Sequence, residues 1–275
     1  MRLILEGDKT QKNRAFVNRH LSLLNNSAMN LLELPSDLKN LLLVEDVKTS
    51  FAECRYFLSE REKAISEKIL KLDKVSRRLA EIGVTYINSA LLYGESGTGK
   101  TTFGRYIAYK LQVPFAYLNF SRVIDSYLGS TQKNISKVFD YAKQNKCVLM
   151  LDEIVAIGIR RQERNEVGEM SRIVISLMQN MDALTGDIVL LGATNREDII
   201  DEALMRRFSI KHEVKRLSEE ERYQMSKSFL NDVGYIFKED WLHGICKKDA
   251  TQAELKNRLI EALVEKYYNE ENLKN

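Results

Sequence analysis

The segment "GESGTGKT", residues 94–101, has the residue types and spacing of a loop that binds phosphate. It fits the pattern G-x-x-x-x-G-K-[ST] in full, with an apolar segment before it and a helical pattern after it. Glycines let successive backbone N–H groups turn toward one anion, and the N-terminus of the following helix adds its dipole. An incidental glycine-rich turn is the alternative, but the context on both sides argues against it. We therefore expect a nucleotide phosphate site here.

Two side chains of this loop have distinct expected tasks. Lys100 would reach the β- and γ-phosphates, and the hydroxyl of Thr101 would bind Mg²⁺. The loop residues expected to contact the nucleotide are Gly94, Glu95, Ser96, Gly97, Thr98, Gly99, Lys100, Thr101 and Thr102.

A second feature is the apolar run "CVLMLDEI", residues 147–154, which contains two adjacent acids. Such a strand places Asp152 and Glu153 at the carboxyl edge of a parallel sheet, where open α/β sheets bind ligands. Asp152 would hold Mg²⁺ through its water shell, and Glu153 would polarise the water that attacks the γ-phosphate. Binding alone needs one acid, whereas hydrolysis benefits from the second. The sequence thus favours an enzyme.

A third apolar run, "DIVLLGATN", ends in Asn195. An amide at the same sheet edge can orient the attacking water or contact the γ-phosphate. The alternative is an asparagine that merely ends the strand. Asn195 is therefore a candidate catalytic residue.

Short apolar strands alternate with amphipathic helical patterns from residue 89 onward. This alternation predicts a parallel sheet covered by helices on both faces. We expect a P-loop NTPase αβα sandwich with a five-stranded parallel sheet, followed by a small all-α lid. The expected strands lie within residues 90–94, 115–120, 147–153, 187–195 and 209–214.

Four parts of the chain are expected. Residues 1–43 form an N-terminal segment of unclear role, 44–88 a helical linker, 89–217 the α/β domain and 218–275 the helical lid. Apolar residues from 48 to 82 recur at helical spacing over a length that fits one long helix or two with a break. A coiled-coil arm is one reading. We favour N-terminal helices packed on the following domain.

Composition narrows the class of protein. The net charge of +3 over 275 residues is too small to argue for nucleic-acid binding. Three separated cysteines without metal-ligand spacing indicate a reducing compartment. No run approaches the roughly 20 apolar residues of a membrane span, and the opening apolar run is too short for a signal peptide. We expect a cytoplasmic protein.

Taken together, "GESGTGKT", "LMLDEI", "LLGATN" and "DEALMRRF" resemble, in order, the motifs of the AAA+ ATPases, and within them the AAA family proper. The resemblance covers about residues 44–268. Its last motif is similar to the arginine-finger region of the spastin and katanin group, which implies Arg206 and Arg207 as fingers. In such an arrangement they would face a neighbouring subunit's nucleotide and stabilise charge on the transferring phosphoryl group.

The resemblance also suggests a role for "YLG", residues 127–129, in an otherwise polar stretch. Family members carry an aromatic, an aliphatic and a glycine in a loop that projects into a central channel. Tyr127 and Leu128 would grip an extended polypeptide, and Gly129 would let the loop move. A locally packed turn is the alternative. The charged loop at 160–168 would lie lower in the channel, and Asp182 would sense the neighbour's nucleotide.

Three departures from the family pattern stand out. Val155 replaces the acid that usually follows the acidic strand. The adenine-contacting stretch appears as "EDVKTS", with Asp46 and Val47 aligned but both glycines absent. In the lid, Gln252 replaces a glycine, while Ala253 fits the expected adenine pocket.

The resemblance implies an ATPase that uses ATP and Mg²⁺ and forms a homo-oligomeric ring, a hexamer in the family pattern. Such a ring remodels, unfolds or disassembles proteins through its pore. An adaptor could bind the N-terminal segment. One alternative is a nucleic-acid motor or replication-factor loader, but the aromatic-aliphatic loop and modest charge argue against it. Another is a module that uses ATP only to assemble, which Glu153 and the paired arginines disfavour.

Overall fold

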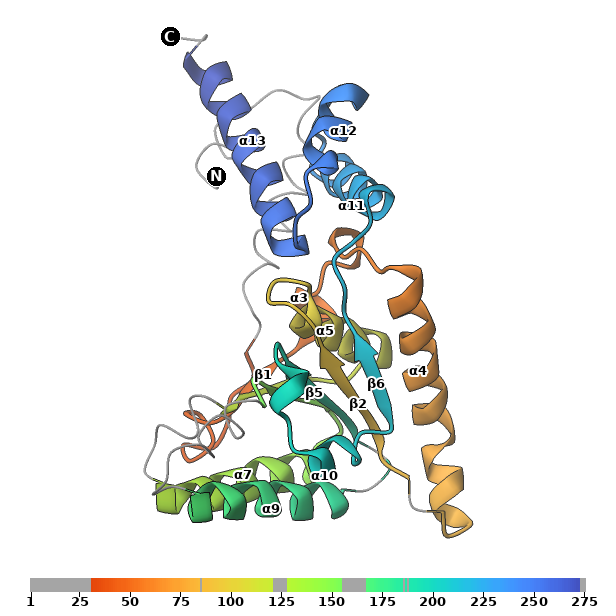
Figure 1. Cartoon of the computed structure of the whole chain (residues 1–275), viewed down its shortest axis with the longest axis vertical. Helices are drawn as coiled ribbons and strands as arrows, with labels where there is room; N and C mark the ends of the chain where they lie inside the picture. The colour runs from red at the N-terminus through yellow and green to blue at the C-terminus, as the bar shows by residue number, and fades with distance from the viewer. Residues whose placement is uncertain are drawn as a thin grey trace.

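The computed structural model of the protein describes residues 31–84, 86–120, 128–154, 167–184, 186 and 188–272. Its centre is a six-stranded sheet in the order β1-β3-β4-β5-β2-β6 (Figure 1). The strands are β1 (Leu43–Glu45), β2 (Asn88–Tyr93), β3 (Phe115–Asn119), β4 (Val148–Asp152), β5 (Val189–Thr194) and β6 (Ile210–Glu213).

The five strands expected from the apolar runs are all present and parallel to one another. The sheet has one strand more than expected. β1 pairs antiparallel with β3, with Leu43 opposite Tyr117. Its three residues lie in a leucine-rich stretch without alternation, so the sequence carried no strand pattern for it.

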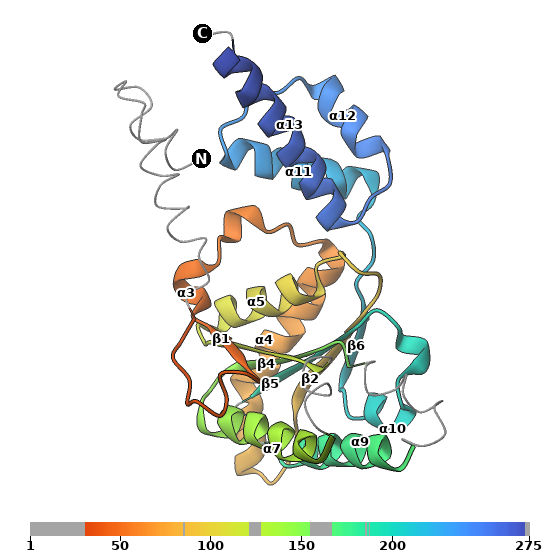
Figure 2. The same cartoon turned by 90° about the vertical axis from the view of Figure 1, so that its left-hand side faces the viewer.

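Helices cover both faces of the sheet, which confirms the expected αβα arrangement. Helices α4 (Glu60–Glu81) and α5 (Lys100–Leu111) lie on one face, and α7 (Leu128–Gln144) and α9 (Val167–Asp182) on the other (Figures 1 and 2). Alternate residues of β4 enter opposite cores: Val148 and Met150 pack on the α5 side, Leu149 and Leu151 on the α7 side. Burial on both faces explains the uninterrupted apolar strands.

The stretch from 48 to 82 is broken rather than continuous. It contains α3 (Val47–Ser50), a 3₁₀ turn η1 (Glu53–Arg55) and α4, which begins at a capping box formed by Ser59 and Glu62. Ile69 of α4 is fully buried against the α5 side of the sheet. This apolar face is therefore used inside the chain and is not free to pair with another helix.

The C-terminal part contains α11 (Glu219–Asp232), α12 (Glu239–Lys247) and α13 (Gln252–Asn272). These helices share their own apolar core, in which Leu230, Leu242 and Leu259 are fully buried. They stand above the sheet at the end where β2 runs into the glycine-rich loop (Figure 2). Short elements η3 (Glu197–Ile199) and α10 (Glu202–Met205) precede β6. The domain boundaries remain a prediction.

Within the described ranges, no helix is both long and apolar enough to cross a membrane.

Candidate nucleotide-binding site

A cavity of 470 Å³ lies where the sheet, the glycine-rich loop and the lid meet. Residues 96–102 of the loop line it, whereas Gly94 and Glu95 are not among its lining residues. Asp152 and Glu153 reach it from β4, and Thr194 and Asn195 from β5. The sheet therefore brings together the loop, the acidic pair and the asparagine that the sequence placed on separate segments.

Glycine is required at the two ends of the loop. Gly94 has φ of 133°, and a Cβ built there would lie 2.4 Å from the carbonyl oxygen of Val214. Gly99 has φ of 97° and is the N-cap of α5. Both residues have a positive φ, a backbone conformation that is unfavourable for residues with a Cβ. The loop can thus turn its N–H groups inward and pass directly into the helix N-terminus.

The Lys100 ammonium is held inside the loop. Its Nζ donates hydrogen bonds to the carbonyl oxygens of Gly94 at 2.7 Å and Glu95 at 2.8 Å. Burial lowers the pKa of Lys100, and the carboxylates of Asp152 and Glu95 oppose that shift. A half-buried ammonium with two carbonyl partners is a centre of positive charge suited to a polyphosphate.

Thr101 and Asp152 form the next contact along the cavity. The Thr101 hydroxyl donates to Asp152 Oδ2 at 2.9 Å, and Asp152 Oδ1 accepts from the backbone N–H of Glu153 at 2.9 Å. A hydroxyl and a carboxylate are hard oxygen ligands of the kind that Mg²⁺ prefers. These two residues therefore fit a magnesium site beside the phosphate loop.

Glu153 and the end of β5 are held together by backbone contacts. The N–H of Ile154 donates to the carbonyl oxygen of Ala193 at 3.2 Å, just before Thr194. Thr194 is buried and its hydroxyl accepts from the N–H of Arg196 at 3.0 Å, whereas Asn195 is exposed to the cavity. This arrangement keeps the Glu153 carboxylate and the Asn195 amide at the same edge of the sheet.

The structure does not bring Asp46 and Val47 to the cavity, contrary to the sequence expectation. The Asp46 side chain caps α3 by accepting from the N–H of Lys48, and Val47 is fully buried under the sheet. The aligned stretch lacks both glycines and forms a helix turn instead. Residues 55–57, which the sequence analysis did not select, are among the residues that line the cavity. The adjacent aromatics Tyr56 and Phe57, after a break in the helical pattern, were the available signal.

The lid closes the cavity from above. Ala253 lines it as expected, and its N–H donates to the carbonyl oxygen of Gly97 at 3.0 Å. Gln252 and Lys256 of α13 and Met225 of α11 are also lining residues. Gln252 donates from Nε2 to the carbonyl oxygen of Lys215 at 3.3 Å.

Comparison with known proteins agrees with this geometry. Residues 90–216 match the family described as ATPase family associated with various cellular activities (AAA). Residues 90–216 of the chain therefore form an AAA ATPase domain, the domain of the AAA+ ATPases. The match includes the loop, the acidic strand, the β5 strand and the paired arginines.

Curated relatives support this assignment. The chain is 36% identical over 131 residues to the proteasome-activating nucleotidase of Methanoregula boonei. The aligned residues cover 46% of the chain and 30% of that protein. It is 34% identical over 153 residues to the 26S proteasome regulatory subunit S10B homolog B of Arabidopsis thaliana, covering 53% and 38% respectively. With the 26S proteasome regulatory subunit 8 homolog B of Arabidopsis thaliana it shares 32% over 218 residues, covering 75% and 52%. The matched part of the chain thus spans 30% to 52% of these relatives' lengths.

Arg206 and Arg207 of the AAA domain do not line the chain's own cavity. Arg206 is 71% exposed and pairs with Glu202 at 2.5 Å. Arg207 makes two bonds of 2.9 Å to Asp182 and a third to the carbonyl oxygen of Ala203. Asp182, expected to contact a neighbour, is engaged by Arg207 within the chain.

Several expected residues lie outside the described part of the AAA domain. Tyr127 and Val155 are outside it, as are residues 160–166 of the charged loop. Leu128 and Gly129 begin helix α7. The roles assigned to these residues, and the likeness to the spastin and katanin group, stay predictions.

Proposed function

We propose that the protein hydrolyses ATP with Mg²⁺ and works as a ring of copies that unfolds or remodels other proteins. The observation that carries hydrolysis is the contact between Thr101 and Asp152, with Glu153 next to it and Lys100 in the adjoining loop. This set supplies a phosphate cradle, hard oxygen ligands and a second carboxylate. A module that only binds ATP needs no second carboxylate.

Each group then has a distinct task. The loop N–H groups and Lys100 bind the phosphates, and Thr101 and Asp152 would hold Mg²⁺, whose charge neutralises the phosphate oxygens. Glu153 accepts a proton from the attacking water, and Asn195 orients that water from the end of β5. The glycine-rich loop with the start of α5, the end of β4 and the end of β5 lie at one edge of the sheet, so these groups surround a single cavity.

The ring is supported by the position of the paired arginines. Because Arg206 and Arg207 lie away from the chain's own cavity, a neighbouring copy is the place where they can meet a nucleotide. A guanidinium there stabilises the negative charge that spreads over the transferred phosphoryl group. We propose a hexamer, with Tyr127, Leu128 and Gly129 facing its channel.

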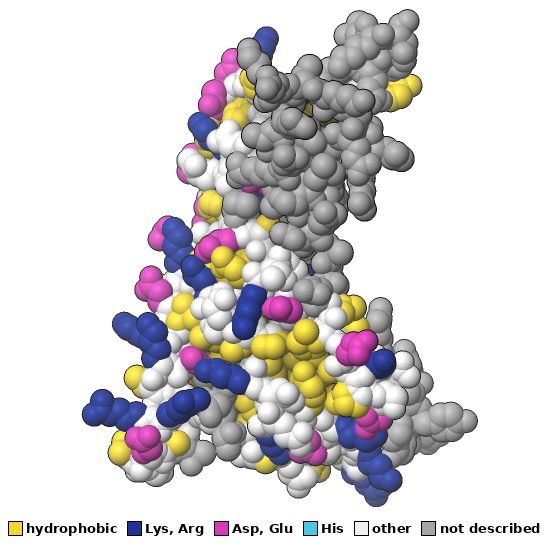
Figure 3. Space-filling model, turned by 180° about the vertical axis from the view of Figure 1, so that it is seen from behind, with side chains coloured by type: hydrophobic (Ala, Val, Ile, Leu, Met, Phe, Trp, Pro, Cys, Tyr) yellow, Lys and Arg dark blue, Asp and Glu magenta, His cyan; other side chains and the backbone are white. Residues whose placement is uncertain are grey.

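The polypeptide substrate is supported by the relatives, since they are named as proteasome-activating nucleotidases and proteasome regulatory subunits. A nucleic-acid motor is less favoured. On the face shown in Figure 3, basic and acidic side chains are interspersed around an apolar area. ATPase stimulation by DNA with a steep salt dependence would instead favour the nucleic-acid motor.

Paired variants of the nucleotide site test the hydrolysis. Glu153→Gln should abolish hydrolysis while ATP still binds, because the amide keeps the shape but cannot accept a proton. Lys100→Ala should weaken ATP binding itself. ATP turnover and equilibrium binding of a fluorescent ATP analogue measure the two effects. Turnover by Glu153→Gln within about threefold of wild type would show that Glu153 is not the general base.

A further inference from the structure

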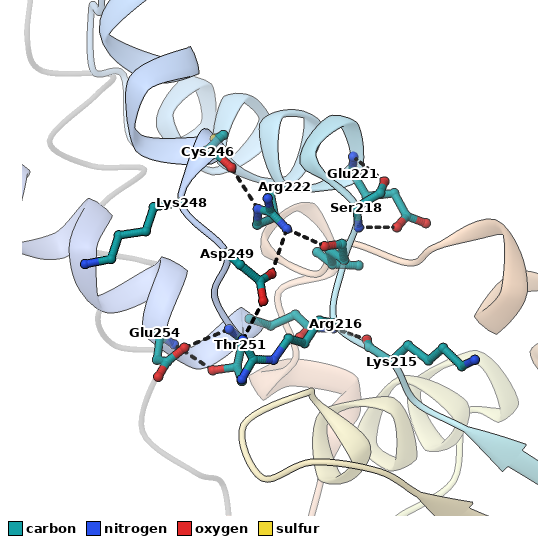
Figure 4. A network of polar contacts seen from close by, with 12 residues as sticks. Lys215, Arg216, Ser218, Glu221, Arg222, Cys246, Lys248, Asp249, Thr251 and Glu254 are labelled. Carbon is teal, nitrogen blue, oxygen red and sulfur yellow. Dashed lines mark hydrogen bonds and ion pairs between the residues drawn. The ribbon is translucent and has the colours of Figure 1, made fainter.

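A charged network joins the phosphate loop to the lid through one arginine. Arg216 lies in the short connection between β6 and α11 (Figure 4). Its Nε and Nη2 donate to the two carboxylate oxygens of Glu95, each at 2.6 Å. Its Nη1 donates to Asp249 Oδ2, also at 2.6 Å. One guanidinium thus holds a carboxylate of the loop and a carboxylate of the lid.

The lid end of this network is anchored in a buried position. Asp249 also accepts from Arg222 Nη1 at 3.1 Å. Arg222 is buried and donates to the carbonyl oxygens of Leu217 at 2.6 Å and Cys246 at 2.8 Å. These bonds fix the turn between α12 and α13 to the start of α11. Because these bonds join α11, the end of α12 and the turn before α13, a displacement of Asp249 would move the three lid helices together.

The loop end lies directly beside the phosphate cradle. The carbonyl oxygen of Glu95 accepts from Lys100 Nζ, and a few residues later the carbonyl oxygen of Gly97 accepts from the N–H of Ala253. A Cβ at Gly97 would lie 3.0 Å from the Thr251 hydroxyl, so loop and lid are already in close contact. The Arg216 bridge acts in parallel with these backbone contacts.

Most exposed ion pairs contribute little, because solvent and ions screen them. Two features set this one apart. The Glu95 contact is bidentate, and both acids share one fork whose donors are fixed in a plane. Hydrogen bonds from Arg216 hold the pKa of Glu95 and the pKa of Asp249 below their ordinary values, which reflects the same pairing.

We propose that Arg216 is a positioning residue for the ATPase: through Glu95 and Asp249 it sets the lid over the nucleotide cavity. Met225, Gln252, Ala253 and Lys256 are the lid residues that this places at the cavity. The inference rests on the proposed ATPase function. It differs from a catalytic role, because Arg216 does not line the cavity and acts only through its two partners.

A simpler role is charge balance, in which Arg216 only neutralises Glu95 beside the phosphates. The two roles predict different outcomes for combined variants. Removing both side chains restores the charge balance but not the bridge. Replacing Arg216 by Lys keeps the charge but removes the planar fork that reaches two acids at once.

Steady-state ATPase kinetics of the full chain provide the first test. Arg216→Ala, Arg216→Lys and the double variant Glu95→Ala, Arg216→Ala should each raise KM for ATP about tenfold, the effect of losing a charge-assisted contact, with kcat within about twofold. Lys143→Ala is the control, because it removes an exposed ion pair on α7 far from the lid. Full recovery of KM in the double variant would overturn the positioning role in favour of charge balance.

A distance measurement tests the same inference without relying on activity. Spin labels at Glu261→Cys on α13 and Lys133→Cys on α7, in a Cys54→Ser background, report the lid relative to the sheet. We expect Arg216→Ala to broaden the distance distribution measured with AMP-PNP, while Lys143→Ala leaves it unchanged. An unchanged distribution together with an unchanged KM would overturn the proposal. A wild-type chain that does not hydrolyse ATP would contradict the proposed function instead, and the distances would still test the bridge.

Discussion

At the scale of single residues, Glu153 differs from its neighbours in backbone conformation. Among the described residues, only Gln112 and Glu153 combine a side chain with positive φ, at 56° and 55°. Gln112 is the C-cap of α5, where a left-handed residue is common. Glu153 is not a helix cap. It directly follows β4 at the carboxyl edge of the sheet, so a helix end does not explain its left-handed backbone. Unfavourable backbone geometry of this kind is typical of functional positions.

The loop geometry gives a prediction for glycine replacements. Gly94→Ala should abolish measurable ATP binding, because its Cβ would overlap the Val214 carbonyl oxygen at 2.4 Å and force the loop away from Lys100. Gly83→Ala is the matched control: its φ is also positive, at 77°, but a Cβ there meets no atom within 4 Å. Gly83→Ala should lose about 1–2 kcal/mol of stability at most and keep its ATP affinity. Calorimetric titration with ATP separates the two, and equal affinities would contradict the steric argument.

Burial likewise predicts the reactivity of Cys147. Burial raises the pKa of its thiol to about 12. At pH 8 the group is therefore protonated as well as inaccessible, and iodoacetamide should not modify it in the folded protein. Peptide mapping by mass spectrometry before and after addition of urea checks this, with modification expected only after unfolding. Rapid labelling of the native protein at Cys147 would show that this part of the sheet opens.

At the scale of elements, the sequence predicted those strands and loops that a short-range residue pattern determines. The strands β2, β3, β4 and β5 were visible because they are largely apolar, whereas the edge strand β6 was identified as the last segment of the strand–helix series. The loop was visible because its chemistry is confined to eight consecutive positions. β1 was missed because its three residues are too few to show the alternation of apolar and polar side chains that marks a strand. The Glu95–Arg216 bridge joins positions 121 apart, and no local signal links them. Asp46 and Val47 were misplaced because the aligned segment, without its glycines, forms a helix turn.

Helix α4 provides a test of whether the segment before the AAA domain folds with it. Ile69 is fully buried against the sheet, so Ile69→Ala should lower the free energy of unfolding by about 2–5 kcal/mol. Ile82, at the C-cap of the same helix, is 70% exposed, and Ile82→Ala should change stability by about 0.5 kcal/mol or less. Urea unfolding followed by circular dichroism measures both. Similar small effects would indicate that α4 packs only loosely on the sheet.

At the scale of the whole molecule, the proposed ring assigns the cavity and the paired arginines of one chain to two different nucleotide sites. The loop, the acids and the lid line the cavity, whereas the side chains of Arg206 and Arg207 lie beyond α10 and contact Glu202, Asp182 and Ala203. In the ring that we propose, each cavity would face the arginines of the next copy. Activity should therefore depend on protein concentration, even at saturating ATP.

Mixing of inactive variants tests this arrangement directly. An Arg206→Ala, Arg207→Ala chain keeps an intact cavity, and a Glu153→Gln chain keeps intact arginines. Each alone should be inactive, since loss of such an arginine typically reduces the rate by about 10³–10⁵. Mixed rings should regain part of the activity, because some cavities of the first chain will face arginines of the second.

The control for this experiment is a mixture of Lys100→Ala with Glu153→Gln. Both variants are defective in their own cavity, so no pairing of copies creates an intact site and no recovery is expected. Co-assembly in each mixture is verified by differential tags and co-purification, and ATP turnover is followed across mixing ratios. If the arginine variant and Glu153→Gln co-assemble but recover no activity at any ratio, Arg206 and Arg207 do not act on a neighbouring site. The pair between Arg207 and Asp182 would then have a structural role, holding α9 against the turn before β6.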